Sequence, residues 1–203
     1  MWLRKIIMMS KKLFLILFLS FPILINAQKL KNFSKDRVKS VVDSTYVNNM
    51  ILKQSFVVNV SLDSVWNAYT TKKGWESWAV AIAEIDFKIN GTIKTNYNKN
   101  GKIGDESTIT LNVINYLPKK MITLQAELTK NFPSFMKDDE KDLYNIILFE
   151  EVSATQTKII SYGIGYKPNK QYKLLLKFFI KGNEQSYLNL INYLETGKST
   201  VNY

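Results

Sequence analysis

The sequence predicts an α+β domain in which one curved, mainly antiparallel β-sheet wraps around a long C-terminal helix. Segments that alternate apolar and polar residues recur between about residues 54 and 166, with turn residues between them. An apolar stripe with helical spacing then runs from Lys170 to Gly197. A sheet of this kind must bury one face, and the final helix is the only predicted element long enough to cover it.

The chain begins with the pattern of a secretory signal peptide. Basic residues precede an apolar run from Leu13 to Ile25, and the small residue Ala27 follows. A retained membrane anchor is the alternative, but this run is short against the roughly 20 residues that span a bilayer. We therefore expect residues 1–27 to be removed by cleavage after Ala27, and the protein to be periplasmic or secreted.

Residues 28–50 form a polar leader before the predicted domain at 51–203. Only a weak stripe of Val38, Val41 and Val42 interrupts it, which predicts a loosely held arm or a short helix packed on the domain. Hydrophobic residues make up 46% of the chain and charged residues 22%, a composition typical of globular proteins. The absence of cysteine excludes disulfides and thiolate metal sites.

The chain is basic, with a formal net charge of +11. Removal of residues 1–27 takes away four basic residues and no acidic ones, which leaves 24 Lys and Arg against 17 Asp and Glu. Nucleic acid is not an expected partner, because no binding motif for it is present and an exported protein does not meet it. An anionic membrane surface, or solubility alone, explains the charge better.

The sequence pattern at the start of the domain predicts a strand followed by two short helices. The strand begins near Gln54, where apolar and polar side chains alternate. Ser61 is a good N-cap, and apolar residues follow at helical spacing. Gly74 separates this helix from a second turn. The apolar positions are Phe56, Val58 and Val60 in the strand, Leu62, Val65, Trp66 and Tyr69 in the helix, and Trp75 and Trp78 in the turn.

About six strands follow. Asn90-Gly91 is a strong hairpin signal between the first two of these strands. The loop from Asn131 to Asp142 mixes aromatic and acidic residues and separates the fourth strand from the last two. The strands are marked by Ile85, Phe87 and Ile89; by Ile93, Thr95 and Tyr97; by Ile109, Leu111 and Val113; by Ile122, Leu124, Ala126 and Leu128; by residues 143–149; and by residues 159–166.

The final helix carries an apolar face opposite a row of lysines. Gly182-Asn183 lies inside it and predicts a weak point. The lysines form either a solvated face or a transient contact with anionic lipid headgroups. The lysines are Lys170, Lys173, Lys177 and Lys181, and the apolar residues are Tyr172, Leu175, Leu176, Phe179, Tyr187, Leu190, Ile191 and Leu194.

The order of elements resembles the START-like, helix-grip superfamily (SRPBCC), which includes polyketide cyclase/dehydrase proteins. Particular words resemble the branch named after the activator of heat-shock protein 90 ATPase: Val65-Trp66, Thr70-Thr71, Gly74-Trp75, Trp78, Ile85-Asp86, Asn90-Gly91, Phe149-Glu150-Glu151 and Thr157. The likeness covers roughly residues 54–197. A lone Gly91 stands where that branch usually has a glycine pair. Because a cytosolic chaperone does not meet an exported protein, we do not expect a chaperone partner.

The resemblance implies a cavity between sheet and helix that holds a small apolar molecule or lipid. Aromatic side chains suit such a pocket, although inward aromatics at this spacing also serve simply as core. The candidate lining residues are Trp75 and Trp78 at one mouth; Phe87, Tyr97, Ile109 and Tyr162 on the sheet; Phe132 and Phe135 as a lid; and Tyr172, Phe179 and Tyr187 on the helix.

The sequence assigns no catalytic residue, metal or cofactor. It contains no histidine, which removes the commonest general base and the usual zinc ligands. Glu84 and Asp86 share a strand face, but alternation with Ile85 and Phe87 places them toward solvent. The leading hypothesis is a non-catalytic carrier of a small hydrophobic ligand. The alternatives are a cyclase or hydrolase that uses carboxylate or Tyr in the same cavity, and an interaction protein with a filled core.

Overall fold

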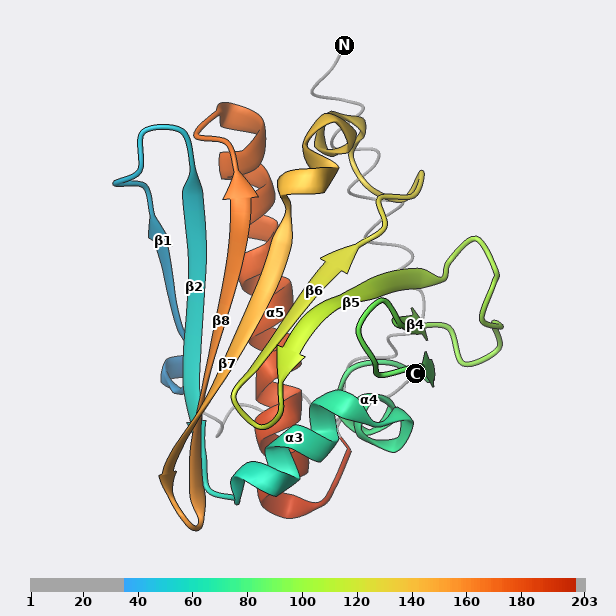
Figure 1. Ribbon diagram of the computed structural model, residues 1–203, viewed down its shortest axis with the longest axis vertical. Coiled ribbons are helices and arrows are strands. Elements are labelled where there is room, and N and C mark those ends of the chain that lie inside the picture. The colour runs from blue at the N-terminus through green and yellow to red at the C-terminus, as the bar shows by residue number, and fades with distance from the viewer. Residues whose placement is uncertain (1–34, 200–203) are drawn as a thin grey trace.

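The computed structural model describes residues 35–199, and its eight strands form one antiparallel sheet in the order β1-β2-β8-β7-β6-β5-β4-β3. The long helix α5 (Lys170–Thr196) runs along one face of this sheet (Figure 1). The predicted fold class is therefore confirmed. The strands are β1 (Lys39–Asp43), β2 (Met50–Val58), β3 (Ile82–Ile85), β4 (Thr92–Asn96), β5 (Ile109–Leu117), β6 (Met121–Ala126), β7 (Tyr144–Ser153) and β8 (Gln156–Tyr166).

The structure corrects the prediction for part of the leader. Residues Lys39–Asp43 are neither a loose arm nor a helix, because they form the edge strand β1 and pair antiparallel with β2. A short 3-10 helix, η1 (Lys35–Arg37), precedes β1. Arg37 donates hydrogen bonds to both carboxylate oxygens of Glu195 and to the carbonyl of Val57, so this segment is tied to the end of α5 and to β2. The predicted signal peptide lies outside the described residues.

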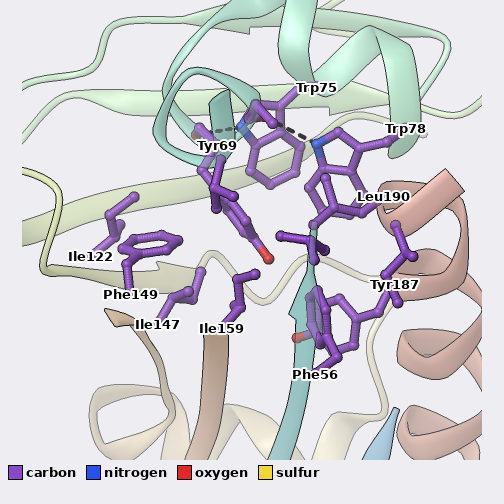
Figure 2. Close-up of a cluster of buried hydrophobic side chains, with 14 of the residues drawn as sticks. Phe56, Tyr69, Trp75, Trp78, Ile122, Ile147, Phe149, Ile159, Tyr187 and Leu190 are labelled. Atoms are coloured by element: carbon purple, nitrogen blue, oxygen red, sulfur yellow. Dashed lines mark hydrogen bonds between the residues drawn. The ribbon is translucent and has the colours of Figure 1, made fainter. Parts of the chain in front are cut away.

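Two short helices, α3 (Leu62–Thr70) and α4 (Lys72–Trp78), follow β2 as predicted. The Ser61 side chain caps α3 by accepting a hydrogen bond from the Ser64 amide. The C-terminal carbonyls of α3 lack helical partners, and two indoles of α4 supply them. Trp75 Nε1 donates to the Tyr69 carbonyl at 2.7 Å and Trp78 Nε1 to the Ala68 carbonyl at 3.0 Å (Figure 2).

Gly74 allows this contact between α3 and α4. A Cβ atom at position 74 would lie 2.6 Å from the carbonyl oxygens of both Asn67 and Ala68, which are backbone atoms and cannot move aside easily. Any other residue would push α4 away from α3. The Gly-Trp-x-x-Trp sequence is therefore a packing motif, in which the glycine gives the close approach and the indoles satisfy the end of the helix.

Helix α5 is continuous for 27 residues, as the predicted long final helix requires, and it includes the predicted weak point at Gly182-Asn183. Asn183 faces the sheet, where its Nδ2 donates to Oε1 of Gln54 at 2.8 Å. Gln54 is 1% exposed and donates in turn to Ser40, whose hydroxyl donates to Glu184. This network joins β1, β2 and α5 and offsets the weak helix propensity of Gly and Asn by giving buried polar groups their partners.

The core consists of two apolar clusters at the two ends of the sheet. The larger lies under α3, α4 and the C-terminal half of α5, and the smaller lies under the N-terminal half of α5 and the 3-10 segment η2 (Ser134–Asp142). In Figure 1, α3 and α4 sit at one end of α5 and η2 at the other. Within residues 35–199, no helix is long and apolar enough to cross a membrane.

Candidate functional site

A cavity of about 200 Å³ lies where the two apolar clusters meet. It is bounded by the sheet, α4, α5 and the η2 region. Most of its lining atoms belong to aromatic or aliphatic side chains. The lining residues are Tyr69, Trp75, Trp78, Leu111, Leu124, Ala126, Leu128, Phe132, Met136, Leu143, Tyr144, Asn145, Ile147, Tyr166, Phe179 and Tyr187.

The α4 wall of the cavity is rigid. Trp75 is 8% and Trp78 5% exposed, and their rings lie 5.5 Å apart. Because both indole N–H groups are bonded to the carbonyls of α3, these rings present only apolar surface to the cavity. They fix the shape of this wall and offer a ligand no hydrogen bond.

The wall opposite α4 carries the phenol groups of Tyr166 and Tyr187, and small residues of β8 leave the space that these rings occupy. A Cβ atom at Gly163 would lie 2.8 Å from the Tyr166 hydroxyl, so a larger residue here would require the Tyr166 ring to shift from its place over the strand. Tyr187 of α5 packs on Phe56 with ring centroids 4.8 Å apart and interacts with Ser161. Burial and then the neighbouring Tyr187 raise the pKa of Tyr166 to about 12, so its phenol stays protonated at neutral pH.

Tyr69 is the most unusual lining residue. It is 3% exposed, and its hydroxyl is the single buried side-chain polar atom without a hydrogen-bond partner in the described part of the chain. In Figure 2 this hydroxyl points away from the two tryptophans and toward the side of the core that holds Ile159 and Tyr187. Burial, with a smaller effect of Tyr187, raises the pKa of Tyr69 well above its usual range.

A latch holds η2 over the other end of the cavity. Phe132 and Met136 line the cavity from this region. Asp139, 4% exposed, accepts a hydrogen bond from the Tyr172 hydroxyl at 2.8 Å and forms an ion pair with Lys167. Burial acts to raise the pKa of Asp139, but the hydrogen bonds from Lys167 and Tyr172 and nearby lysine charge outweigh it, and this pKa lies below its ordinary value. The ionised carboxylate therefore ties η2 to the start of α5.

The family model of Activator of Hsp90 ATPase homolog 1-like proteins matches residues 59–195. The chain belongs to this family. The match begins at the end of β2 and ends within the last turn of α5, so it includes every element that lines the cavity. This confirms the resemblance in the sequence and the assignment to the START-like superfamily. Comparison with curated proteins finds no match.

Solved structures show the same fold at low identity. A conserved protein of unknown function from Enterococcus faecalis has a TM-score of 0.59 and 11% identity, with 87% of each chain covered. The Aha1 dimer from Colwellia psychrerythraea has a TM-score of 0.55 and 17% identity, covering 73% of this chain and 98% of that one. CalU16 from Micromonospora echinospora has a TM-score of 0.54 and 12% identity, covering 80% and 84%. At these identities the likeness establishes the fold alone.

Five of the candidate residues line the cavity of this Activator of Hsp90 ATPase homolog 1-like domain. They come from α4, α5 and the segment before η2, and they are Trp75, Trp78, Phe132, Phe179 and Tyr187. The two tryptophans form a buried wall and not the mouth that the sequence predicts, because α4 folds back on α3. Whether any of these side chains contacts a ligand stays a prediction.

Three candidates from the sheet region do not line the cavity. Phe87 lies beyond the end of β3 and packs with Trp66 and Tyr116, with ring centroids 5.8 and 4.9 Å apart. Tyr97 follows the end of β4, and Ile109 opens β5. The sequence indicates apolar alternation at these positions but not where each strand ends, and these residues lie at or beyond a strand end.

Three other candidates contact different surroundings. Tyr172 uses its hydroxyl on Asp139, and Phe135 packs edge-on against Tyr172 with centroids 5.1 Å apart, so both belong to the latch region. Tyr162 lies on the outer face of the sheet, where Lys53 sits 5.7 Å from its ring centroid. Strand alternation explains this placement, because the inward positions of β8 are Ser161 and Gly163.

Sequence reasoning missed the lining residues that are aliphatic or unusual in placement. The aliphatic members of β5, β6 and β7 alternate like any core residues and give no separate signal. Tyr69 was identified only as part of the apolar face of its helix. The pair Ser161 and Gly163 is the signal that could have revealed the wall, since small inward residues in a strand leave room for large neighbours.

No Asp, Glu, Lys or Arg is among the residues that line the cavity. Glu84 and Asp86 are exposed and lie beside Lys94 and Lys88, in agreement with the predicted solvent face. Within the described ranges, no group of acidic side chains has the arrangement of a metal site. Chemistry by carboxylates in this cavity is therefore not supported by its lining, and tyrosine remains the only ionisable group there.

Proposed function

We propose that the protein is an exported, non-catalytic carrier of a small hydrophobic molecule, which it holds in the cavity between sheet and α5. The observation that carries the proposal is the cavity itself. Its volume of about 200 Å³ equals several water molecules and exceeds the roughly 150 Å³ of an apolar cavity that binds benzene. A filled-core interaction protein has no use for such a space, because voids cost stability.

The lining supports binding more than catalysis. The α4 wall of the cavity is rigid and apolar. The η2 end is held by polar contacts near the surface: the ion pair of Asp139 with the exposed Lys167, the hydrogen bond from Tyr172, and two hydrogen bonds that Glu140 accepts from Gln125 and Leu128. A carrier needs a preformed pocket and a way in. An enzyme using Tyr in this cavity is the second candidate, and the unpartnered hydroxyl of Tyr69 is the observation that favours it.

Native mass spectrometry tests the carrier proposal. The protein is purified from its own envelope, and we expect a reproducible extra mass that denaturation releases. Ala126 lines the cavity, so Ala126→Phe should fill it and abolish the extra mass. Ala154→Phe, which adds the same ring in the exposed β7–β8 turn, is the matched control and should retain it. An unchanged mass in Ala126→Phe would place the ligand elsewhere.

Export is supported by the order of basic, apolar and small residues in 1–27. N-terminal sequencing of the protein from a fractionated cell should give Gln28 as the first residue. A chain that still begins at Met1 or Met9 in the membrane fraction would indicate a retained anchor instead.

The exposed face of the N-terminal half of α5 supports transient contact with anionic lipid. Leu174 is 46% exposed and lies on the same helix face as four lysines. Within residues 35–199, these lysines take part in no ion pair. Lysine around exposed apolar side chains suits a helix that lies on a membrane surface. The lysines of this face are Lys170, Lys173, Lys177 and Lys181.

Vesicle sedimentation tests this contact. We expect binding to vesicles that contain phosphatidylglycerol, none to pure phosphatidylcholine, and loss of binding when the four lysines of α5 become glutamine. The matched control replaces four exposed lysines elsewhere that also form no ion pair: Lys73, Lys99, Lys102 and Lys198. Equal loss in both variants would mean that net charge alone, and not this face, attracts the protein to lipid.

A further inference from the structure

Tyr69 holds a hydroxyl that the protein itself does not use. The residue is 3% exposed, and the centroid of its ring lies 5.2 Å from that of Phe149 and 5.4 Å from that of Trp78. A buried hydroxyl without a partner costs about 1–3 kcal/mol in stability relative to one that is bonded. A phenylalanine here would fill nearly the same space without that cost.

No residue in the described part of the chain accepts a hydrogen bond from this hydroxyl. The carbonyls of Tyr69 and Ala68 at the end of α3 accept hydrogen bonds from the indoles of Trp75 and Trp78, and the hydroxyl points away from these indoles (Figure 2). Asn145, which lines the same cavity, donates through its Nδ2 to Ser161 and the Tyr162 carbonyl, and its Oδ1 receives no hydrogen bond from Tyr69. The Tyr69 hydroxyl points toward Tyr187, which lines the same cavity (Figure 2).

The protonation state makes this group a donor. Burial disfavours the phenolate, and the nearby Tyr187 adds to the effect, so the pKa of Tyr69 stays well above neutral pH. A neutral phenol donates one hydrogen bond and accepts others. The strongest gain for a buried O–H is therefore an oxygen acceptor that arrives with a ligand.

We propose that the cavity selects a small, ring-sized apolar molecule with a carbonyl-type oxygen, and that Tyr69 orients this oxygen by donating a hydrogen bond, with Tyr187 beside it. The inference rests on the proposed carrier function and narrows its ligand class. The Tyr69 oxygen is enclosed in the structure, so this hydrogen bond requires a small shift of the surrounding side chains when the ligand binds. Most of the remaining lining residues offer the ligand apolar contacts, while this one hydrogen bond sets its direction.

Two isosteric probes test the proposal. Acetophenone and α-methylstyrene differ only by a carbonyl oxygen in place of a methylene group. Their dissociation constants are measured by NMR titration of the purified protein. We expect the wild type to bind acetophenone about tenfold more tightly, since one net hydrogen bond to a neutral donor has about that effect. In Tyr69→Phe the ratio should fall to about one, while α-methylstyrene binds at least as well as before.

Tyr116→Phe is the matched control, because Tyr116 packs on Trp66 and Phe87 outside the cavity, and it should keep the wild-type ratio. Tyr187→Phe, which keeps the contact with Phe56, provides a second variant and should reduce the ratio partially. Equal binding of both probes by the wild type, or an unchanged ratio in Tyr69→Phe, overturns the role of Tyr69 and leaves the carrier function intact. If neither probe binds the wild type and the native spectrum shows no extra mass, both the role of Tyr69 and the carrier function are overturned.

Discussion

Replacement of Trp75 by phenylalanine should show that the indole N–H groups of α4 hold the end of α3. The substitution removes the donor that lies 2.7 Å from the Tyr69 carbonyl and leaves that buried carbonyl without a partner, at a cost of about 1–3 kcal/mol. Replacement of the two-ring indole by a single phenyl ring removes a few tens of Å² of buried apolar area, about 1 kcal/mol. We therefore expect the free energy of unfolding to fall by about 3 kcal/mol.

Trp66→Phe is the comparison that isolates the hydrogen bond. Trp66 makes edge-on contacts with Phe87 and Phe149, but its indole nitrogen donates to no residue in the described part of the chain. Its replacement should cost only the apolar area, about 1 kcal/mol. Urea unfolding followed by circular dichroism measures both variants with one value of m. If Trp75→Phe costs no more than Trp66→Phe, the indoles pack without capping the helix and the reasoning is refuted.

Three further predictions concern the glycines and the latch. Gly74→Ala should lower the free energy of unfolding by at least about 3 kcal/mol, because its Cβ would lie 2.6 Å from two backbone carbonyl oxygens. Gly182→Ala has open space around its Cβ and should raise the free energy of unfolding by about 1 kcal/mol. Thermal melting distinguishes the two variants, and equal effects would contradict the packing argument. The folded pKa of Asp139 lies below its ordinary value, so the carboxylate stabilises the fold above about pH 4, and this contribution is lost as the pH falls through the folded pKa. The urea midpoint of Asp139→Asn should therefore decline less steeply between about pH 5 and pH 2 than that of the wild type. Parallel declines would assign the acid sensitivity to other groups. Tyr172→Phe removes the neutral donor to Asp139 and should speed hydrogen exchange of the η2 amides without changing that of β7. Equal protection of η2 would show that the ion pair with Lys167 and the hydrogen bonds of Glu140 suffice to hold it.

The sequence by itself determined the fold class, the order of elements from β2 to α5, and the family. Strand and helix periods, the Ser61 cap and the Asn90-Gly91 turn are local signals, and each acts over a few residues regardless of what packs against it. The Gly-Trp-x-x-Trp pattern and the spacing of the later strands gave the family resemblance that the family model confirms. The exposure of Glu84 and Asp86 also followed from strand alternation alone.

The site needed the tertiary structure, because a cavity is the space left between elements that are distant in the chain. Tyr162 and Phe87 are aromatic at plausible positions, yet one faces outward and the other lies past the end of its strand. Strand β1 forms only because the edge of β2 is free to pair with it. Asn183 is accommodated in the middle of α5 because its side chain donates a hydrogen bond to the buried Gln54. The unpartnered state of the Tyr69 hydroxyl is of the same kind, since a missing hydrogen bond is a property of all the surrounding residues together and of no segment of the sequence.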